Sequence, residues 1–138
     1  MHALEETRRI LVPEGVLIDL RPVADRWPVG VVSGGNQHEI AWMTDLPSGL
    51  ADDEAANHAF IEIARRGSFV CESELTFLFF FYWDTPEEML TYIQEKWNDS
   101  LILEKDSFSA TQNDWATAGT DRRVRVREKM VLTRWRRH

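Results

Sequence analysis

The stretch FVCESELTFLFFFYW, residues 69–83, decides what kind of fold this chain can adopt. Its first half alternates apolar and polar side chains, and from Leu75 onward nearly every residue is apolar or aromatic. A run of this kind is typical of a long β-strand that is covered on both faces. We therefore expect it to lie inside a sheet or under a helix. Truncating Phe79 or Phe81 to alanine should then cost about 3–5 kcal/mol each, as for other buried phenylalanines.

Helix signals lie on both sides of this strand. Residues 52–66 carry an apolar stripe at helical spacing, and Gly67 supplies the left-handed residue that ends many helices. After the strand, Thr85-Pro86-Glu87-Glu88 combines a capping residue, a proline in the first helical position and a glutamate that can complete a capping box. Further helices are expected over residues 2–11 and, with Ser107 as the cap, over residues 107–118.

Shorter strands complete the pattern. Residues 16–20 form a compact apolar run that is typical of a buried strand. Residues 29–32 and 38–43 flank the turn signal Ser33-Gly34-Gly35-Asn36, which predicts a hairpin. Near the C-terminus, residues 124–132 alternate apolar and basic side chains. This order predicts one domain over residues 1–138, of the α/β or α+β class, with a mixed, largely antiparallel sheet flanked by helices.

Composition excludes several classes of protein. Hydrophobic residues make up 43% of the 138 residues and charged residues 28%, which is an ordinary globular balance. The single cysteine, Cys71, rules out a disulfide scaffold, and its acidic neighbours Glu72 and Glu74 favour a structural thiol over a reactive one. No apolar run reaches the roughly 18 residues of a membrane span. The first ten residues lack the apolar core of a signal peptide, so we expect a cytoplasmic protein.

Charge is distributed unevenly. The chain carries a net charge of −7, although its last 18 residues hold eight basic residues against two acidic ones. The acidic body argues against nucleic-acid binding, because its field repels phosphate. A local strip of Arg123, Arg125, Arg127 and Lys129 could still contact phosphates, with Trp135 stacking on a base. We favour the interpretation that the strip is a charged outer face that protects a strand.

Two sets of residues are candidates for ligand binding. Asp19 and Arg21 share one face at the carboxyl end of the strand over residues 16–20, where ligands of open α/β sheets bind. The competing interpretation is an ion pair that fixes the strand end. Six tryptophans are many for this length, and Trp42 and Trp83 could line an aromatic pocket for a small aromatic or lipid-like ligand. A packed aromatic core or a dimer interface is the interpretation that we favour.

Metal and cofactor chemistry find little support in the residue pattern. His38 and Glu39 are adjacent on one strand and therefore point to opposite faces. No pair of histidines or cysteines has the spacing of metal ligands, so we expect no metal. Nor do we expect a bound cofactor, because no G-x-G-x-x-G turn is present and Gly34-Gly35 lies in a hairpin turn.

The stretch RRILVPEGVLIDLRP, residues 8–22, resembles a junction in class I S-adenosylmethionine-dependent methyltransferases. There a helix leads through a Pro-Gly-Gly turn into the fifth strand, and Glu14 stands here in place of a glycine. The downstream order of helix, strand, helix and last strand is also similar, whereas the hairpin over residues 29–43 is an insertion. In that family strands six and seven form an antiparallel hairpin at the sheet edge. The resemblance covers nearly the whole chain but only the family's C-terminal half.

This resemblance implies a truncated, Rossmann-like methyltransferase fold that lacks the cofactor-binding half. It implies a protein that is not catalytic alone and that acts as a homodimer or with a separate cofactor-binding subunit, so whether it is part of an enzyme stays open. The alternative is a small-molecule-binding α+β domain with an aromatic-lined pocket.

The missing half also has a consequence for assembly. In the complete family sheet the fifth strand lies between the fourth and the seventh, so residues 16–20 should present a bare apolar edge. Either the hairpin folds back over this edge, or the edge or the hairpin pairs with a second copy. We favour a homodimer that buries well over about 1,000 Å² in total, with the hairpin or its tryptophans inside.

Overall fold

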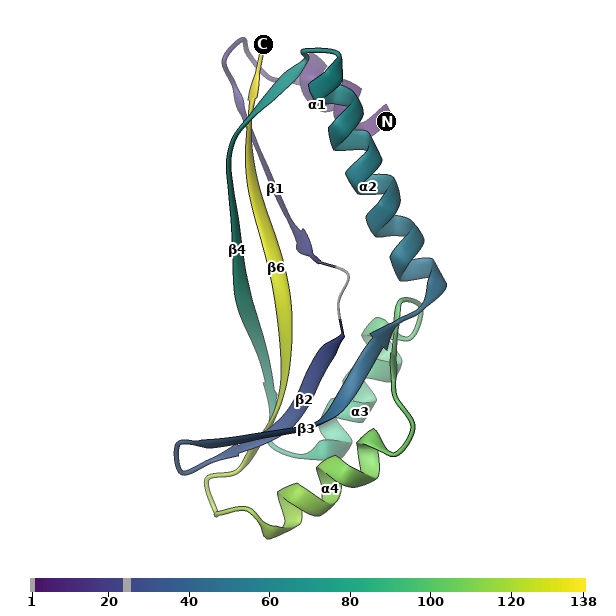
Figure 1. Ribbon diagram of the computed structural model, residues 1–138, viewed down its shortest axis with the longest axis vertical. Helices are drawn as coiled ribbons and strands as arrows, with labels where there is room; N and C mark the ends of the chain where they lie inside the picture. The colour runs from purple at the N-terminus through teal and green to yellow at the C-terminus, as the bar shows by residue number, and fades with distance from the viewer. Residues whose placement is uncertain (1, 24–25) are drawn as a thin grey trace. The chain divides into compact units, whose positions relative to one another are not determined.

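The computed structural model describes residues 2–23 and 26–138 and shows a mixed α/β fold (Figure 1). In chain order the elements are α1 (His2–Ile10), β1 (Val16–Pro22), β2 (Trp27–Ser33), β3 (Asn36–Asp45), α2 (Pro47–Arg65), β4 (Phe69–Trp83), α3 (Pro86–Tyr92) with a π-helical turn η1 (Ile93–Trp97), β5 (Leu101–Leu103), α4 (Ser107–Thr117) and β6 (Arg123–Arg137). A largely antiparallel sheet flanked by helices confirms the expected fold class.

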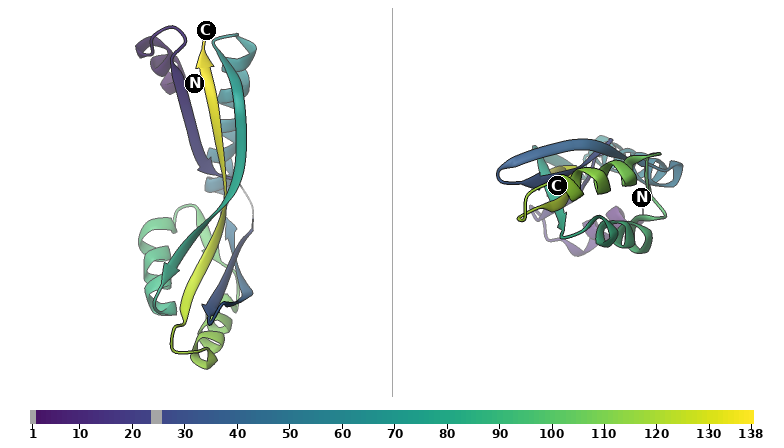
Figure 2. Two further views of the ribbon diagram at one scale, coloured as in Figure 1. Left: turned by 90° about the vertical axis from the view of Figure 1, so that its left-hand side faces the viewer. Right: turned by 90° about the horizontal axis from the view of Figure 1, so that it is seen from below.

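Strand β6 organises the sheet. The strands are hydrogen-bonded in the order β1-β6-β2-β3-β5, and β4 also pairs with β6. Along one edge of β6, residues 130–136 pair with β1 and residues 123–126 pair with β2, both antiparallel. Figure 2 shows β1 and β4 on opposite sides of β6. β6 is 15 residues long, so β1 and β2 can pair with successive parts of it.

The chain divides into two compact units. We call the first the β1 unit; it comprises Met1–Val23, Ala51–Phe77 and Met130–His138, described from residue 2 onward. The second, the hairpin unit, comprises Ala24–Leu50, described from Arg26 onward, and Leu78–Lys129. The expectation of one domain stays a prediction.

In the β1 unit, α1 and α2 cover one face of the strands (Figure 1). Ile63, Phe69 and Trp135 form its buried core. The Trp135 ring stacks on Phe60 with centroids 5.0 Å apart, and its Nε1 donates a hydrogen bond to Thr133 Oγ1 over 2.8 Å. These contacts hold α2 against the inner face of β6.

In the hairpin unit, the helices pack on β2, β3 and β6. Its buried core includes Val29 of β2, Met43 of β3, Met89 of α3 and Val126 of β6. Beside this core lies a cluster of five aromatic rings in mutual contact, from Trp27, Phe81, Trp83, Tyr92 and Trp97. Burial of these rings supplies much of the unit's stability.

Several local signals act as expected. Thr85 Oγ1 accepts a hydrogen bond from the Glu88 backbone N–H over 3.2 Å and caps α3. Gly67 follows α2 with φ of 65°, and Gly34 and Gly35 form the hairpin turn with φ of 56° and 78°.

Two helix starts differ from expectation. Ser107 does not cap α4 through its side chain; its hydroxyl instead accepts a hydrogen bond from the Trp42 backbone N–H. Helix α2 begins at Pro47, because proline is tolerated in a first helical turn.

The expected burial of two strands is wrong. β4 pairs only with β6 among the described residues, and Phe79 and Leu78 are 46% and 48% exposed. β1 also lies at an edge, with Ile18 52% and Leu20 55% exposed. The physical reason is that β6 occupies the interior position between β1 and β4. These two strands are therefore left at edges, although their sequences are strongly apolar.

Phe79 and Phe81 should therefore differ in their contribution to stability. Phe81 packs against the core of the hairpin unit, with its ring centroid 4.9 Å from that of Trp97. We expect Phe81→Ala to lower the free energy of unfolding by about 3 kcal/mol and Phe79→Ala by about 1 kcal/mol. Urea denaturation of both variants measures the difference, and equal losses would contradict the edge position of Phe79.

A buried carboxyl group interrupts the core face of β6. Glu128 is only 5% exposed. Burial, and to a smaller extent the negative charge of Asp45, raise its pKa to about 7. The folded protein therefore holds a proton on Glu128 between about pH 4.5 and pH 7, whereas the unfolded chain releases it.

Stability should consequently fall as pH rises through this interval. We expect Glu128→Gln, which cannot ionise, to unfold at higher urea than the wild type at pH 8, by up to about 3 kcal/mol. At pH 4 both forms are neutral at this position, so the two proteins should unfold together. A difference between them that is the same at both pH values would rule out ionisation of Glu128 as the cause.

Candidate functional site

The structure brings Asp19 and Arg21 together as an ion pair. Arg21 Nε donates to Asp19 Oδ2 over 2.9 Å, and Thr133 Oγ1 of β6 donates to the same oxygen over 3.2 Å. The Arg21 guanidinium also lies 5.6 Å from the ring centroid of Phe60 on α2. These contacts tie the end of β1 to its neighbours, as the structural interpretation predicts.

Trp83 and Trp42 lie in different surroundings. The Trp83 ring belongs to the aromatic cluster of the hairpin unit, with centroid distances of 5.4 Å to Tyr92 and 6.1 Å to Trp97. The cluster is packed by its own rings, which agrees with the packed-core interpretation. Trp42, on β3, instead borders an open hollow.

We call this space the Trp42 hollow, and its volume is about 340 Å³. Residues in or next to β2, β3, β4 and β6 line it. Strand alternation places Arg127 and Lys129 of β6 on the face opposite to that of the core side chains Val124 and Val126. The lining residues are Arg26, Trp27, Pro28, Trp42, Leu78, Arg127 and Lys129.

An ion-pair network supports one side of the hollow. Arg127 donates to both carboxylate oxygens of Glu39, over 2.8 Å each, and Arg125 Nη2 donates to Glu39 Oε1, also over 2.8 Å. The hydrogen bond from Arg127 is the main reason why the pKa of Glu39 lies below its ordinary value. Arg125 is only 7% exposed and also donates to Gln37. The network joins β3 to β6 across the outer face of the sheet.

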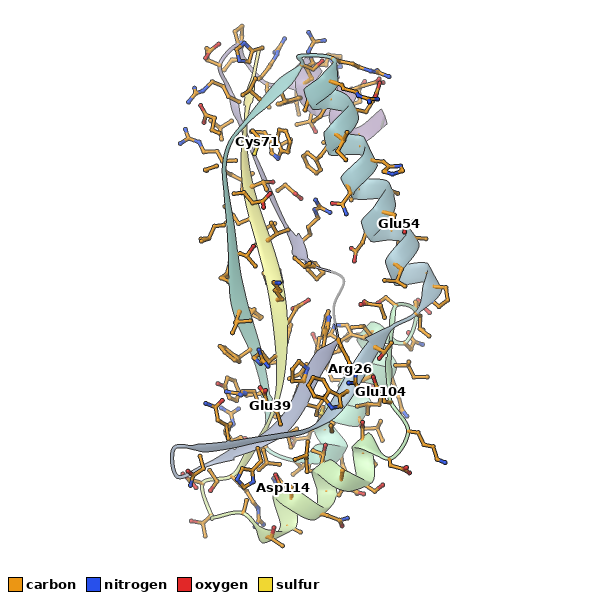
Figure 3. The ribbon with its side chains drawn as sticks, viewed as in Figure 1. Arg26, Glu39, Glu54, Cys71, Glu104 and Asp114 are labelled. Carbon is orange, nitrogen blue, oxygen red and sulfur yellow. The ribbon has the colours of Figure 1, made fainter. Side chains whose placement is uncertain are left out.

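A second ion pair fixes the opposite side. Arg26 Nε donates to Glu104 over 2.7 Å, and Figure 3 shows the two side chains close together. Thr44 Oγ1 also donates to Glu104, over 2.6 Å. The hydrogen bonds from Arg26 and then Thr44 lower the pKa of Glu104 to about 2. The Arg26 guanidinium lies 4.4 Å from the Trp42 ring centroid and so holds this ring in place.

The rest of the basic strip is already bound to neighbours. Arg123 pairs with Asp84 over 3.2 Å and lies 5.2 Å from the Tyr82 ring centroid. Arg125 is buried by its contacts with Glu39 and Phe80. Trp135 lies in the core of the β1 unit, so the idea that it stacks on a nucleic-acid base is wrong. Burial of Arg125 therefore interrupts the strip, although Arg123 stays about half exposed.

A smaller polar hollow of about 160 Å³ lies between the hairpin and α4. His38 Nδ1 is 3.3 Å from Asp114 Oδ1, whereas Glu39 points to the other face, toward Arg127. Asp114 Oδ2 is buried and has no hydrogen-bond partner among the described residues. Within residues 2–23 and 26–138, no three His, Cys, Asp or Glu side chains gather around a possible metal position.

The β1 unit has a different kind of candidate surface. Leu17, Asp19 and Arg21 face the helices, whereas Ile18 and Leu20 lie on the uncovered face. β1 has no second strand partner in the described parts of the chain. The suggestion that the hairpin folds back over this edge is wrong, because β2 pairs with β3 and β6, and β3 pairs with β2 and β5. Cys71 is also exposed in this unit, on β4 (Figure 3).

Sequence reasoning found Trp42 but missed its partners. Arg127 and Glu39 are 88 positions apart, and Arg26 and Glu104 are 78 apart. The alternation of basic residues after residue 122 placed Arg127 and Lys129 on one face, but nothing in the sequence indicated Leu78, Arg26 or Glu104 as neighbours of Trp42.

The described helices include none that is both long and apolar enough to cross a membrane. No protein-family model matches the chain, and a search of curated proteins finds no match.

Proposed function

We propose that this chain is a methyltransferase-like protein of the cytoplasm that is not catalytic alone and that acts as a homodimer. The observation that carries this proposal is the bare edge of β1. Ile18 and Leu20 are exposed there, although the inner face of the same strand packs on helices. A strand that is apolar on both faces is typical of a sheet interior with cover on each side.

The strand order of the β1 unit supports the resemblance to class I methyltransferases. β1 corresponds to the fifth strand, β6 to the seventh and β4 to the sixth. The resemblance implies that the fifth strand lies beside the seventh and that the sixth pairs with the seventh at the edge, and the observed order is β1-β6-β4. Glu14 has φ of 62°, a conformation that favours the glycine usual in the family's turn.

The sequence of β1 favours a second copy as the occupant of the edge. If two β1 strands pair antiparallel about an axis at Leu20, Asp19 lies opposite Arg21 of the second copy, and the reverse holds by symmetry. Leu20 then lies opposite its own copy on the uncovered face. Opposite charges and matching apolar residues make this edge complementary to itself.

A second candidate function is the binding of a small molecule by the hairpin unit. The Trp42 hollow, with its aromatic wall and basic rim, is the observation that favours it.

Sedimentation equilibrium tests the homodimer. The chain has a mass of 16.1 kDa, and we expect twice this mass at tens of micromolar protein. Asp19→Arg should produce monomers, because the new arginine would face Arg21 of the second copy. Arg21→Asp should also produce monomers, because the new aspartate would face Asp19 of the second copy. The double swap Asp19→Arg/Arg21→Asp should restore the dimer, and Trp42→Glu in the other unit should leave the mass unchanged. A wild-type mass of one chain would overturn the homodimer. A double variant that stays monomeric would overturn the proposed register.

The isolated chain should not bind S-adenosylmethionine. The motivation is the absence from the sequence of the glycine-rich turn with which the family approaches its cofactor. Isothermal titration should give no binding heat at cofactor concentrations up to about 1 mM. Saturable one-to-one binding at micromolar concentrations would contradict the proposal that this chain is not catalytic alone.

A further inference from the structure

We propose that the small polar hollow between the hairpin and α4 binds a small organic cation that carries N–H donors, an alkylammonium or a guanidinium. We call this space the Asp114 hollow, and its volume is about 160 Å³. Every lining residue lies within residues 31–38 or 114–119, and the structure describes both segments completely. Both segments belong to the hairpin unit, so the proposal depends neither on the homodimer nor on the Trp42 hollow.

Asp114 supplies the negative charge of the hollow. Its side chain lines the hollow and is 20% exposed, and Figure 3 shows it on α4 beside the hairpin. Oδ1 lies 3.3 Å from His38 Nδ1, whereas Oδ2 is buried and has no hydrogen-bond partner among the described residues. A carboxylate can accept about four hydrogen bonds, and an oxygen that is desolvated and unbonded raises the free energy of the folded protein. A cation in the hollow would compensate this charge.

His38 leaves most of this acceptor capacity unused. Because an ionised carboxylate only accepts hydrogen bonds, the proton of the neutral imidazole lies on Nδ1, next to Asp114. Nε2 then carries a lone pair and is itself an acceptor. The His38 side chain is 65% exposed, so its contact with the carboxylate is weakened by solvent. The neutral ring therefore adds an acceptor to the hollow and no second donor.

The two hydroxyl groups of the lining also act as acceptors. Ser33 Oγ donates to Asp121 Oδ1 over 2.6 Å, and this hydrogen bond is the main reason why the pKa of Asp121 lies below its ordinary value. Thr117 Oγ1 donates to the backbone carbonyl of Asp114 over 3.1 Å. Each hydroxyl has a single proton, so both present lone pairs to a ligand. A molecule that satisfies these groups has to donate hydrogen bonds.

The backbone favours a positive charge at the same place. Helix α4 is 11 residues long and ends at Thr117, so its negative C-terminal end borders the hollow. Arg122 donates to the Ala118 carbonyl at this end over 3.3 Å and lies 3.9 Å from the Trp115 ring centroid; it does not line the hollow. Hydrogen bonds from a charged donor to Asp114 would be roughly twice as strong as those from a neutral donor.

The size of the hollow limits the ligand. Its volume of about 160 Å³ is below the roughly 300–1,000 Å³ of most small-molecule sites, so only a compact head group fits and the rest of the ligand extends into solvent. Asp114 is the single carboxylate among its lining residues. One carboxylate matches one ammonium or guanidinium group, whereas a divalent ion such as Ca²⁺ takes about six to eight oxygen ligands.

Nuclear magnetic resonance titration of the full chain with propylammonium and propylguanidinium tests the proposal. We expect at least one of them to bind with a Kd below about 1 mM and to shift the amide signals of residues 31–38 and 114–119. The cation that binds more tightly identifies the preferred head group. A Kd above about 1 mM for both cations would overturn the proposal.

Two further compounds separate the roles of charge and of N–H donors. Tetramethylammonium has the charge without an N–H, and butyramide has N–H donors without the charge. Each should bind at least tenfold more weakly than the better cation, because a charge-assisted hydrogen bond contributes about 1.5–3 kcal/mol. Equal binding of tetramethylammonium would overturn the requirement for N–H donors, and equal binding of butyramide would overturn the requirement for a cation.

Variants locate the site. Asp114→Asn removes the charge at nearly constant shape and should weaken binding at least tenfold, while Thr117→Val removes one acceptor and should weaken it about threefold. Asp99→Asn makes the same change of charge at an exposed residue of the hairpin unit and should leave affinity unchanged. Equal urea midpoints establish that the variants are folded, and if Asp114→Asn does not fold, the tetramethylammonium comparison on the wild-type chain still decides. Affinity that is indifferent to Asp114→Asn would overturn the site.

Discussion

The pairing of β6 on both of its edges is the constraint on which the other features of this protein depend. Its residues 130–136 bond to β1, its residues 123–126 bond to β2, and β4 takes the opposite edge. Strand alternation then assigns every side chain of β6 to a face. Val124 and Val126 point into a core, whereas Arg125 and Arg127 point outward to Glu39. The position of one strand thus determines both where the core forms and where the cations gather.

The same constraint explains the unusual exposure of apolar residues. Because β6 fills the interior position, β1 and β4 are left as edges despite sequences that would suit a sheet interior. Edge strands of soluble proteins usually carry charges that prevent pairing with another chain. β4 follows this rule only in its first half, through Glu72 and Glu74, and β1 follows it only through the Asp19–Arg21 pair. In the proposed homodimer, this pair of opposite charges would repel a strand of the wrong sign pattern and accept its own antiparallel copy.

Signals that act over a few residues could be predicted from the sequence, whereas burial and charge pairing could not. The Thr85 cap and the Gly34-Gly35 turn depend on neighbouring backbone atoms alone, so their residue types sufficed. The exposure of Phe79 depends on which strand occupies the interior of the sheet, and apolar runs in β1 and β4 do not distinguish the alternatives. The three-residue strand β5 lies below the length at which periodicity is visible. The Trp42 hollow could not be predicted from the sequence, because its walls and ion pairs come from β2, β3, β4 and β6 and from Glu104. These residues are separated by up to 88 positions along the chain.

Ion pairing changes what a row of basic residues can do. From the sequence, Arg123, Arg125, Arg127 and Lys129 are four equivalent cations at strand spacing. In the structure Arg123 lies over an aromatic ring and pairs with Asp84, and Arg125 is buried between Glu39 and Phe80. Arg125 is the buried partner, so loss of its contact with Glu39 would leave a desolvated cation without this ion pair, and this arginine is committed to the fold. Lys129, at the end of the row, is exposed and lines the Trp42 hollow. The row is therefore not one uniform charged surface, because the fold assigns each arginine to a neighbour and burial of Arg125 interrupts the row.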